Sequence, residues 1–258
     1  MRFLNPSRTY EDIHSAYLGS LEDVLLAPDY VSSPRGMRCL EKVNYMFTIA
    51  NPVHEPIRTL DLARNIVIAE YTGKEEALYN SCSIRVEDFI KASKFWEKVA
   101  NVDGTINSAY GFLIWKNRSQ GNVKFDNTMR TPWEWAKKSL TEDRDTRQAI
   151  LRFSLPEHSF DGNRDFPCTI AGNFHIRNNK LNLTIVMRSN DLWLGLTYDL
   201  PWFVSLIDRM VEELQPVYPD LVGGSYTHIA HSLHIYERDL DKVRMALGRP
   251  AEAGRADE

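Results

Sequence analysis

Apolar side chains recur every three or four positions in several stretches of the chain, which is the spacing of an amphipathic helix. This spacing predicts helices at residues 9–26, 60–72, 85–100 and 200–214. Thr9 is placed to cap the first of them, and Gly73 is expected to end the second. In the second helix Leu62, Ile66 and Ala69 fall on one face and are expected to point inward. Another helix begins after residue 131, where Thr131, Pro132 and Glu134 have the spacing of a capping box.

Elsewhere, apolar and polar residues alternate along the chain, which predicts strands because successive side chains of a strand point to opposite faces. The predicted strands cover residues 43–50, 148–154 and 226–236, and residues 174–189 form a hairpin that turns at residues 178–180. In the second strand of the hairpin, every other residue is a large apolar one: Leu181, Leu183, Ile185 and Met187. Arg188 therefore lies on the face opposite these side chains.

Helices come first along the chain, and the strands then gather with helices between them. This order favours an α/β or α+β architecture, with a single domain built on a mixed β-sheet flanked by helices. The domain is expected to cover residues 1–247 of the 258. Residues 248–258 are polar and rich in alanine, and we expect them to form a disordered tail.

The composition is that of a globular protein, with 43% hydrophobic and 26% charged residues. A net charge of −4 provides no general attraction to nucleic acid. Three cysteines do not suit a disulfide framework. No apolar run is long enough for a signal peptide or a transmembrane helix. We therefore expect a cytoplasmic protein with neither nucleic acid nor membrane as a partner.

Cys168 is a candidate nucleophile. It follows Pro167 and precedes a predicted strand, and a reactive cysteine needs a cation nearby because the thiolate is the reactive form. Arg188 on the adjacent hairpin strand can supply that charge. On local grounds alone, a small, buried and inert cysteine is the commoner case.

The segment after the hairpin carries groups suited to a phosphate ester. Arg188 and Ser189 offer donors, with the carboxylate of Asp191 beside them. A salt bridge at the strand end explains the same residues equally well. Asp199, at the start of the helix at 200–214, is either a helix cap or a carboxylate that accepts from an exocyclic amine such as cytosine N4.

The histidines suggest a metal site only if their segment is helical. His228, His231 and His234 are spaced by three, which on a helix would place them on one face. The alternation of residues 226–236 predicts a strand, which puts His231 on the opposite face, so no metal is expected. Trp96 and Tyr110 can stack on a ligand or carry a proton, although such aromatic residues more often belong to the core.

Together these motifs resemble those of the thymidylate synthase family. Pro167-Cys168 resembles its catalytic Pro-Cys, and the run from Arg188 to Asp199 resembles its Arg-Ser-x-Asp-x-x-Leu-Gly-x-Pro-Phe-Asn. The segment Ser232-Leu233-His234-Ile235-Tyr236 is similar to Asp-Ala-His-Ile-Tyr. Two shorter matches are Ala109-Tyr110-Gly111 with Val-Tyr-Gly and Asp145-Thr146-Arg147 with Asp-Ser-Arg-Arg.

The resemblance implies a role for each matched residue. Cys168 would attack C6 of a pyrimidine nucleotide, and Tyr110 would stand near the proton that leaves C5. The residues implied to hold the phosphate and the sugar are Arg35, Arg188, Ser189, His234 and Tyr236. The co-substrate would be 5,10-methylenetetrahydrofolate, in contact with Trp96 and Asp191. Because the family is an obligate homodimer, Arg147 would reach the phosphate in the neighbouring active site.

One departure from the synthases concerns the base. Asp199 stands where they have an asparagine that serves uracil, and a carboxyl group that accepts from N4 and shares a proton with N3 suits cytosine. The same change is found in the deoxycytidylate hydroxymethylases of phages, to which the chain is most similar within the family. The implied reaction adds water where a synthase delivers hydride, giving 5-hydroxymethyl-(d)CMP and tetrahydrofolate, with dCMP favoured.

Other departures lie around the reacting atoms. Thr169 replaces the histidine that follows the synthase cysteine, Gln148 replaces a second arginine, and Val99 replaces a second tryptophan. The synthase glutamate that orders water falls at about Ile66. Glu70, one helical turn later, is therefore the expected water-positioning residue.

Four other functions stay open at this point. They are a CMP hydroxymethylase of nucleoside-antibiotic biosynthesis, a divergent dUMP methylase or hydroxymethylase, a hydrolase with a histidine-bound metal, and a nucleotide-binding module without catalysis.

Overall fold

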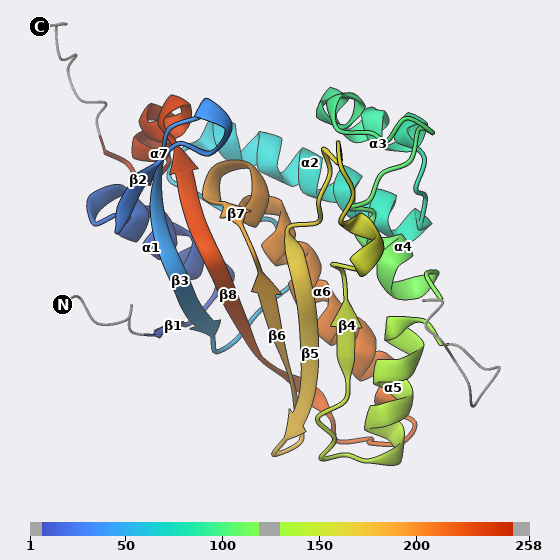
Figure 1. Cartoon of the computed structure of the whole chain (residues 1–258). Coiled ribbons are helices and arrows are strands. Elements are labelled where there is room, and N and C mark those ends of the chain that lie inside the picture. The colour runs from blue at the N-terminus through green and yellow to red at the C-terminus, as the bar shows by residue number, and fades with distance from the viewer. Residues whose placement is uncertain (1–6, 119–129, 250–258) are drawn as a thin grey trace, which may run out of the picture.

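The computed structural model describes residues 7–118 and 130–249, which are built around one mixed eight-stranded β-sheet (Figure 1). The main row of strands has the order β1-β3-β8-β6-β5-β4, while β2 pairs with β3 and β7 with β8. The strands are β1 (Arg8–Tyr10), β2 (Tyr30–Ser32), β3 (Cys39–Ile49), β4 (Ile150–Arg152), β5 (Thr169–Arg177), β6 (Lys180–Met187), β7 (Asn190–Asp191) and β8 (Val222–Tyr236). This sheet confirms the predicted fold class.

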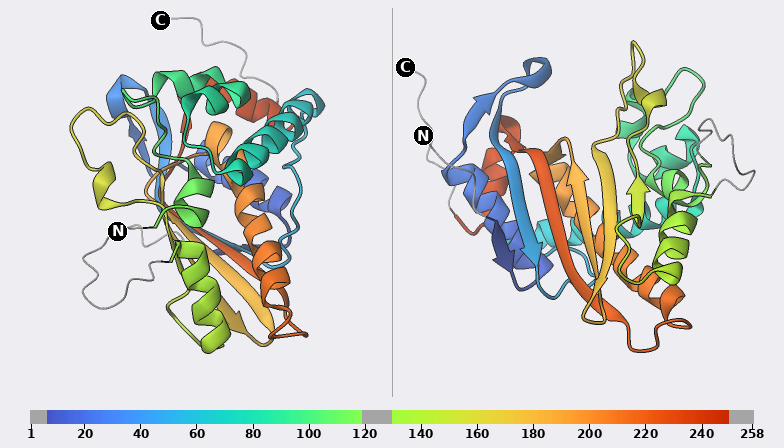
Figure 2. Two further views of the ribbon diagram at one scale, coloured as in Figure 1. Left: turned by 90° about the vertical axis from the view of Figure 1, so that its right-hand side faces the viewer. Right: turned by 60° about the horizontal axis from the view of Figure 1, so that its bottom comes forward.

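Helices cover one face of the sheet (Figures 1 and 2). They are α1 (Ile13–Leu26), α2 (Leu62–Ser81), α3 (Val86–Ala92), α4 (Tyr110–Trp115), α5 (Pro132–Glu142), α6 (Thr197–Leu214) and α7 (Leu240–Ala246). Short 3₁₀ turns are η1 (Pro34–Gly36), η2 (Lys94–Lys98), η3 (Pro156–His158) and η5 (Glu237–Asp239), and η4 (Leu192–Leu196) is a π-helical turn. On the other face, Asn182, Thr184 and Val186 of β6 stay half-buried, and none of the described helices crosses that face.

The first helix begins later than predicted. Thr9 lies in β1, which pairs in parallel with β3, and Asp12 caps α1 instead of Thr9. The Asp12 carboxylate accepts from the backbone N–H of Ser15 at 2.8 Å. A three-residue edge strand is too short to interrupt the apolar spacing, so the pattern alone merged β1 with the helix.

Helix α2 departs most from the prediction. It continues through Gly73 to Ser81, since an interior glycine costs a helix only about 1 kcal/mol. The predicted inward face is also wrong: Leu62 and Ile66 are 79% and 71% exposed, and Ala69 is exposed as well. The buried face instead carries Ile68, Thr72, Glu75, Leu78 and Tyr79.

The helix predicted at residues 85–100 is two short helices, α3 and η2, which meet at an extended residue, Ser93. The Ser93 hydroxyl accepts from the N–H of Phe95 at 3.2 Å and so starts η2. The break turns Trp96 inward and leaves Phe95 58% exposed.

Two local predictions are confirmed. The Thr131 hydroxyl accepts from the N–H of Glu134, whose carboxylate accepts from the N–H of Thr131, and this capping box starts α5. The hairpin of β5 and β6 turns at Asn178 and Asn179, both of which have positive φ (51° and 58°), as a two-residue turn of type I′ requires.

The remaining boundaries differ by a few residues: β3 begins before the predicted residue 43, β4 lies within residues 148–154, and α6 and β8 begin earlier than predicted. None of the described helices combines the length and apolar character that a membrane crossing needs. Of the predicted tail, residues 250–258 lie outside the described residues, whereas the backbone N–H of Arg249 donates to Arg244 O at 2.8 Å.

Candidate functional site

Most of the predicted site residues come together at one end of the sheet. Cys168 directly precedes β5, Arg188 and Ser189 directly follow β6, and β8 ends in the segment of His234 and Tyr236. Because β5 runs against β6 and β8, its start lies beside their ends, in the upper half of Figure 1. The sheet therefore places a thiol, a guanidinium group and an imidazole at a common edge.

Arg188 lies beside Cys168, as the sequence predicted. Its Nη2 is 3.6 Å from the Cys168 Sγ, and the guanidinium group is fixed by donating to the carbonyl oxygens of Phe166 and Pro167, at 2.7 and 3.1 Å. Burial raises the pKa of the Cys168 thiol, and the positive charge of Arg188 acts to lower it. A cation in contact with the sulfur stabilises the thiolate over the thiol, which is the requirement for a nucleophile.

Tyr110 reaches the same place from the start of α4. Its Oη accepts from the backbone N–H of Thr169 at 3.2 Å and lies 2.9 Å from the Thr169 hydroxyl. Burial, followed by the nearby Asp199 and Cys168, raises the pKa of the Tyr110 phenol well above its usual value. The phenol therefore stays protonated at neutral pH, and it contacts Thr169, the residue next to the candidate nucleophile.

Asp199 lies in the first turn of α6, not at a helix cap; the cap of the preceding turn η4 is Asp191. Asn190 Nδ2 donates to Asp199 Oδ2 at 2.8 Å. Burial raises the pKa of Asp199 to about 7. The residue as a whole is half-buried. Near neutral pH this carboxyl group can both donate and accept a proton.

The structure leaves the predicted residue Glu70 at the surface and places another acidic residue of α2, Glu75, close to Asp199. The Glu70 side chain is 65% exposed and pairs with Lys74, with Oε1 and Nζ 2.6 Å apart. Glu75 is only 7% exposed. Burial, and then the neighbouring Asp199, raises its pKa to about 8. Because α2 continues past Gly73, Glu75 is the acidic residue in phase with the buried positions Ile68 and Thr72.

The groups implied to hold phosphate and sugar lie near Cys168 and Asp191. Arg35, in η1, lowers the pKa values of both Cys168 and Tyr236 by its positive charge, against the raising effect of burial. His234 is 6% exposed, its ring meets that of Tyr236 edge to face at 5.0 Å, and its backbone is in register with Asp191 of β7. Asp191 Oδ1 accepts from the N–H groups of Trp193 and Leu194, at 2.8 and 3.2 Å.

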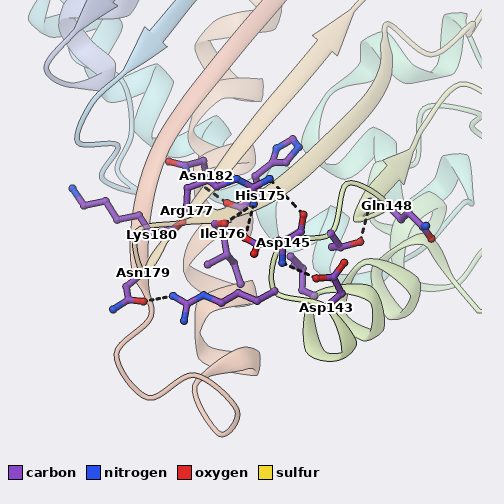
Figure 3. A network of polar contacts seen from close by, with 12 residues as sticks. Asp143, Asp145, Gln148, His175, Ile176, Arg177, Asn179, Lys180 and Asn182 are labelled. Carbon is purple, nitrogen blue, oxygen red and sulfur yellow. Dashed lines mark hydrogen bonds and ion pairs between the residues drawn. The ribbon is translucent and has the colours of Figure 1, made fainter.

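Arg147 is the one predicted site residue at the opposite end of the sheet. It is exposed, in the loop between α5 and β4. The hairpin turn holds this loop: Arg144 donates to the side chain of Asn179, and Arg177 donates to Asp145 O at 3.5 Å and pairs with its carboxylate at 3.6 Å (Figure 3). The nine residues of β5, at about 3.3 Å each, separate this loop from Cys168. No arginine side chain spans that distance.

The three histidines of β8 do not converge. His228 is fully buried and stacks on Phe47, with ring centroids 5.1 Å apart, and burial lowers its pKa to about 3. His231 is exposed on the opposite face. Within residues 7–118 and 130–249, no group of three or more His, Cys, Asp or Glu side chains is placed to hold a metal ion.

Trp96 and Phe95 form an aromatic pair at the edge of the helical layer, with ring centroids 5.8 Å apart. Trp96 is 9% exposed and its Nε1 has no hydrogen-bond partner among the described residues.

Comparison with known proteins identifies relatives of this chain and supports its fold. Residues 63–255 match the family model described as thymidylate synthase. The deoxycytidylate 5-hydroxymethyltransferase of Enterobacteria phage T6 is 29% identical over 242 residues, which cover 91% of this chain and 89% of that protein. The deoxyuridylate hydroxymethyltransferase of Bacillus phage SP01 is 28% identical and covers 86% of this chain and 57% of its own length. A solved structure, thermostable thymidylate synthase A from Bacillus subtilis, aligns with a TM-score of 0.69 at 19% identity, covering 92% of this chain and 84% of that one.

Proposed function

This chain belongs to the thymidylate synthase family, and on that premise we propose that it is a cytidylate 5-hydroxymethylase. It would transfer a one-carbon unit from 5,10-methylenetetrahydrofolate to C5 of a cytidine monophosphate, with dCMP favoured, and water would add to the transferred carbon to give the 5-hydroxymethyl nucleotide and tetrahydrofolate. The observation that carries the cytosine assignment is Asp199, whose pKa of about 7 makes it a proton donor and acceptor at the position of the base.

The donor and acceptor pattern of the two bases explains why a carboxyl group matters here. Cytosine presents N3 as an acceptor and its 4-amino group as a donor, whereas uracil presents N3–H as a donor and O4 as an acceptor. A neutral carboxylic acid offers one O–H donor and one acceptor oxygen. Asp199 in this form gives a proton to N3 and accepts from the amino group. Protonation of N3 also withdraws electrons from C6, the atom that the thiolate attacks.

The proposed reaction begins at Cys168. Its thiolate, stabilised by Arg188, forms a bond to C6 and makes C5 nucleophilic, while Asp199 protonates N3. C5 acquires the one-carbon unit and loses its proton to a water molecule beside Tyr110, and tetrahydrofolate departs to leave an exocyclic methylene. Water then adds to that methylene, and its proton passes to the ionised form of Glu75, which is the minor form near neutral pH because the pKa of this carboxyl group is about 8. Loss of the thiolate restores Cys168, so the sum consumes one water molecule and needs no hydride.

When bound, methylenetetrahydrofolate supplies carbon at the oxidation level of formaldehyde. The residues present fit such a co-substrate. The 58% exposed ring of Phe95, edge to face with the Trp96 ring, suits its flat ring system. Asp191 uses only Oδ1 to cap η4 among the described residues, which leaves Oδ2 for a donor on the ligand.

We also propose that the active protein is a homodimer in which each chain lends Arg147 to the other. Arg147 lies a strand's length from Cys168 of its own chain, so it can serve only another site. The half-buried face of the sheet supports this assembly, since side chains such as Thr184 and Val186 have no helix over them among the described residues. A second copy packed there would bring the loop of one chain toward the Cys168 edge of the other.

A direct test of the function is the measurement of kcat/KM with dCMP, CMP and dUMP as alternative substrates. The expected order places dCMP first, and the hydroxymethyl product is identified by its mass. A chain that methylates or hydroxymethylates dUMP in preference to both cytidine nucleotides would refute the cytosine assignment. A preference for CMP over dCMP would keep the chemistry and change the sugar.

Glu75 and Glu70 provide a matched pair of variants on one helix. Glu75→Gln is expected to lower kcat on the order of 100-fold, because the amide cannot take the proton of the added water. Glu70→Gln is expected to keep kcat within about twofold, since its carboxylate contacts only Lys74 at the surface. Steady-state kinetics with dCMP measure both. Equal losses in the two variants would argue against this role for Glu75.

A further inference from the structure

We propose that Asn190 determines which pyrimidine the site accepts, by fixing the proton of the Asp199 carboxyl group on one of its two oxygens. This inference rests on the proposed function. Asn190 is 2% exposed, and its Nδ2 donates to Asp199 Oδ2 at 2.8 Å. Its Oδ1 is buried and has no partner among the described residues, so Asp199 alone orients the amide.

The fold brings these two side chains together through the turn η4. Asn190 lies in β7, in register with Leu233 of β8. The π-helical turn then returns the chain, so that Asp199 in α6 lies beside it. Gly195 in that turn leaves the room they need, because a Cβ atom there would be 3.0 Å from Asn190 Nδ2 and 3.4 Å from Asp199 Oδ2.

Hydrogen bonds from two sides hold the turn η4 in place. The Thr197 hydroxyl lies 2.9 Å from Tyr17 Oη and 3.0 Å from Trp193 O, and Thr197 and Tyr17 are fully buried. From α2, Arg64 Nη2 donates to Trp193 O at 2.8 Å, with its guanidinium group 4.2 Å above the Trp193 ring. The contact between Asn190 and Asp199 is therefore set before any ligand binds.

A carboxylic acid has one hydroxyl oxygen and one carbonyl oxygen, and the carbonyl oxygen is the better acceptor. By donating to Oδ2, Asn190 favours the form in which Oδ2 is unprotonated and Oδ1 carries the proton. This form complements cytosine, with Oδ1–H directed to N3 and Oδ2 accepting from the 4-amino group. Uracil needs the opposite form, in which Oδ2 carries the proton, and Asn190 opposes that form.

The test replaces the donor and measures base preference. In Asn190→Leu, which keeps the size and removes the amide, the ratio of kcat/KM for dCMP to that for dUMP is expected to fall by about 10- to 100-fold. In Asn190→Asp, the new carboxyl group draws the Asp199 proton toward Oδ2, so the ratio is expected to fall further.

A pH profile separates this positioning role from a merely structural one. The Asn190 amide acts to lower the pKa of Asp199, so its removal raises that pKa. Only protonated Asp199 serves cytosine, and activity on dCMP is lost as pH rises through this pKa. The alkaline limb of kcat/KM for dCMP is therefore expected at higher pH in Asn190→Leu than in the original chain.

Two outcomes are distinguishable. If the original chain prefers dCMP and a folded Asn190→Leu or Asn190→Asp chain keeps both its substrate ratio and its pH profile, the inference about Asn190 is overturned. If the original chain itself prefers dUMP, the proposed function fails whatever Asn190 does. Thermal unfolding identifies which variants are folded. If the Asn190→Leu chain does not fold, the isosteric Asn190→Asp chain decides whether the inference holds.

Discussion

A Cys168→Ser variant is expected to lose turnover by on the order of 1,000-fold or more, because a serine hydroxyl does not ionise near neutral pH. The guanidinium group of Arg188, 3.6 Å from the sulfur, stabilises a thiolate but cannot make an alkoxide available. Cys82→Ser is the matched control, since Cys82 is half-buried at the end of α2 and contacts none of the site residues described above. Assays of one-carbon transfer to dCMP measure both variants. Substantial turnover by Cys168→Ser would remove the nucleophile from the mechanism.

The same inactive chain tests the exchange of Arg147. Arg147→Glu places a negative charge against the nucleotide phosphate of the partner and is expected to be inactive alone. In an equal mixture of the two variants half of the dimers are hybrids, and each hybrid has one site with both Cys168 and a borrowed Arg147. The mixture should therefore regain about a quarter of the original activity. A mixture as inactive as its two components would contradict the exchange.

An Asp199→Asn variant is expected to lose the preference for cytosine, with the ratio of kcat/KM for dCMP to that for dUMP falling on the order of 1,000-fold. An amide cannot transfer a proton to N3, so the attack of Cys168 on C6 of cytosine loses its activation. Uracil needs no such proton, because an amide accepts from N3–H and donates to O4. The Asn190 side chain can flip its amide and accept a hydrogen bond from the new amide at position 199, since its Oδ1 is otherwise unpaired among the described residues.

Competition between dCMP and dUMP in one reaction measures this ratio directly. Asp241→Asn is a suitable control, because it makes the same carboxyl-to-amide change in α7, where the Asp241 side chain is 74% exposed and pairs with Arg244. An Asp199→Asn chain that still prefers dCMP would mean that another residue reads the base.

Sequence patterns predicted the parts of the molecule that local chemistry determines. The capping box of Thr131 and Glu134 and the asparagine turn at residues 178–179 satisfy their own backbone groups, so they form where the sequence places them. The alternation in β6 likewise predicted that Arg188 lies on the face opposite the large apolar residues. The family motifs predicted that Cys168 lies beside Arg188.

The errors arose where distant segments decide the outcome. Gly73 is a weak helix former, but packing of Ile68, Thr72 and Glu75 against the core carries α2 past it, and that extension makes Glu75, and not Glu70, the buried acidic residue of this helix. Asn190 gave no signal, because the role proposed for it depends on a hydrogen bond to a side chain nine residues away across a π-helical turn. A rule that acidic residues in phase with a buried helical face are candidate site residues would have found Glu75.

One competition reaction tests the proposed chemistry most directly: the chain receives methylenetetrahydrofolate and equimolar dCMP, CMP and dUMP in water enriched in ¹⁸O. Mass spectrometry of the nucleotides identifies the base, the sugar and the source of the added oxygen together. We predict a hydroxymethyl group on dCMP that carries ¹⁸O. A methyl group on dUMP, with no ¹⁸O incorporated, would contradict both the reading of Asp199 and the addition of water.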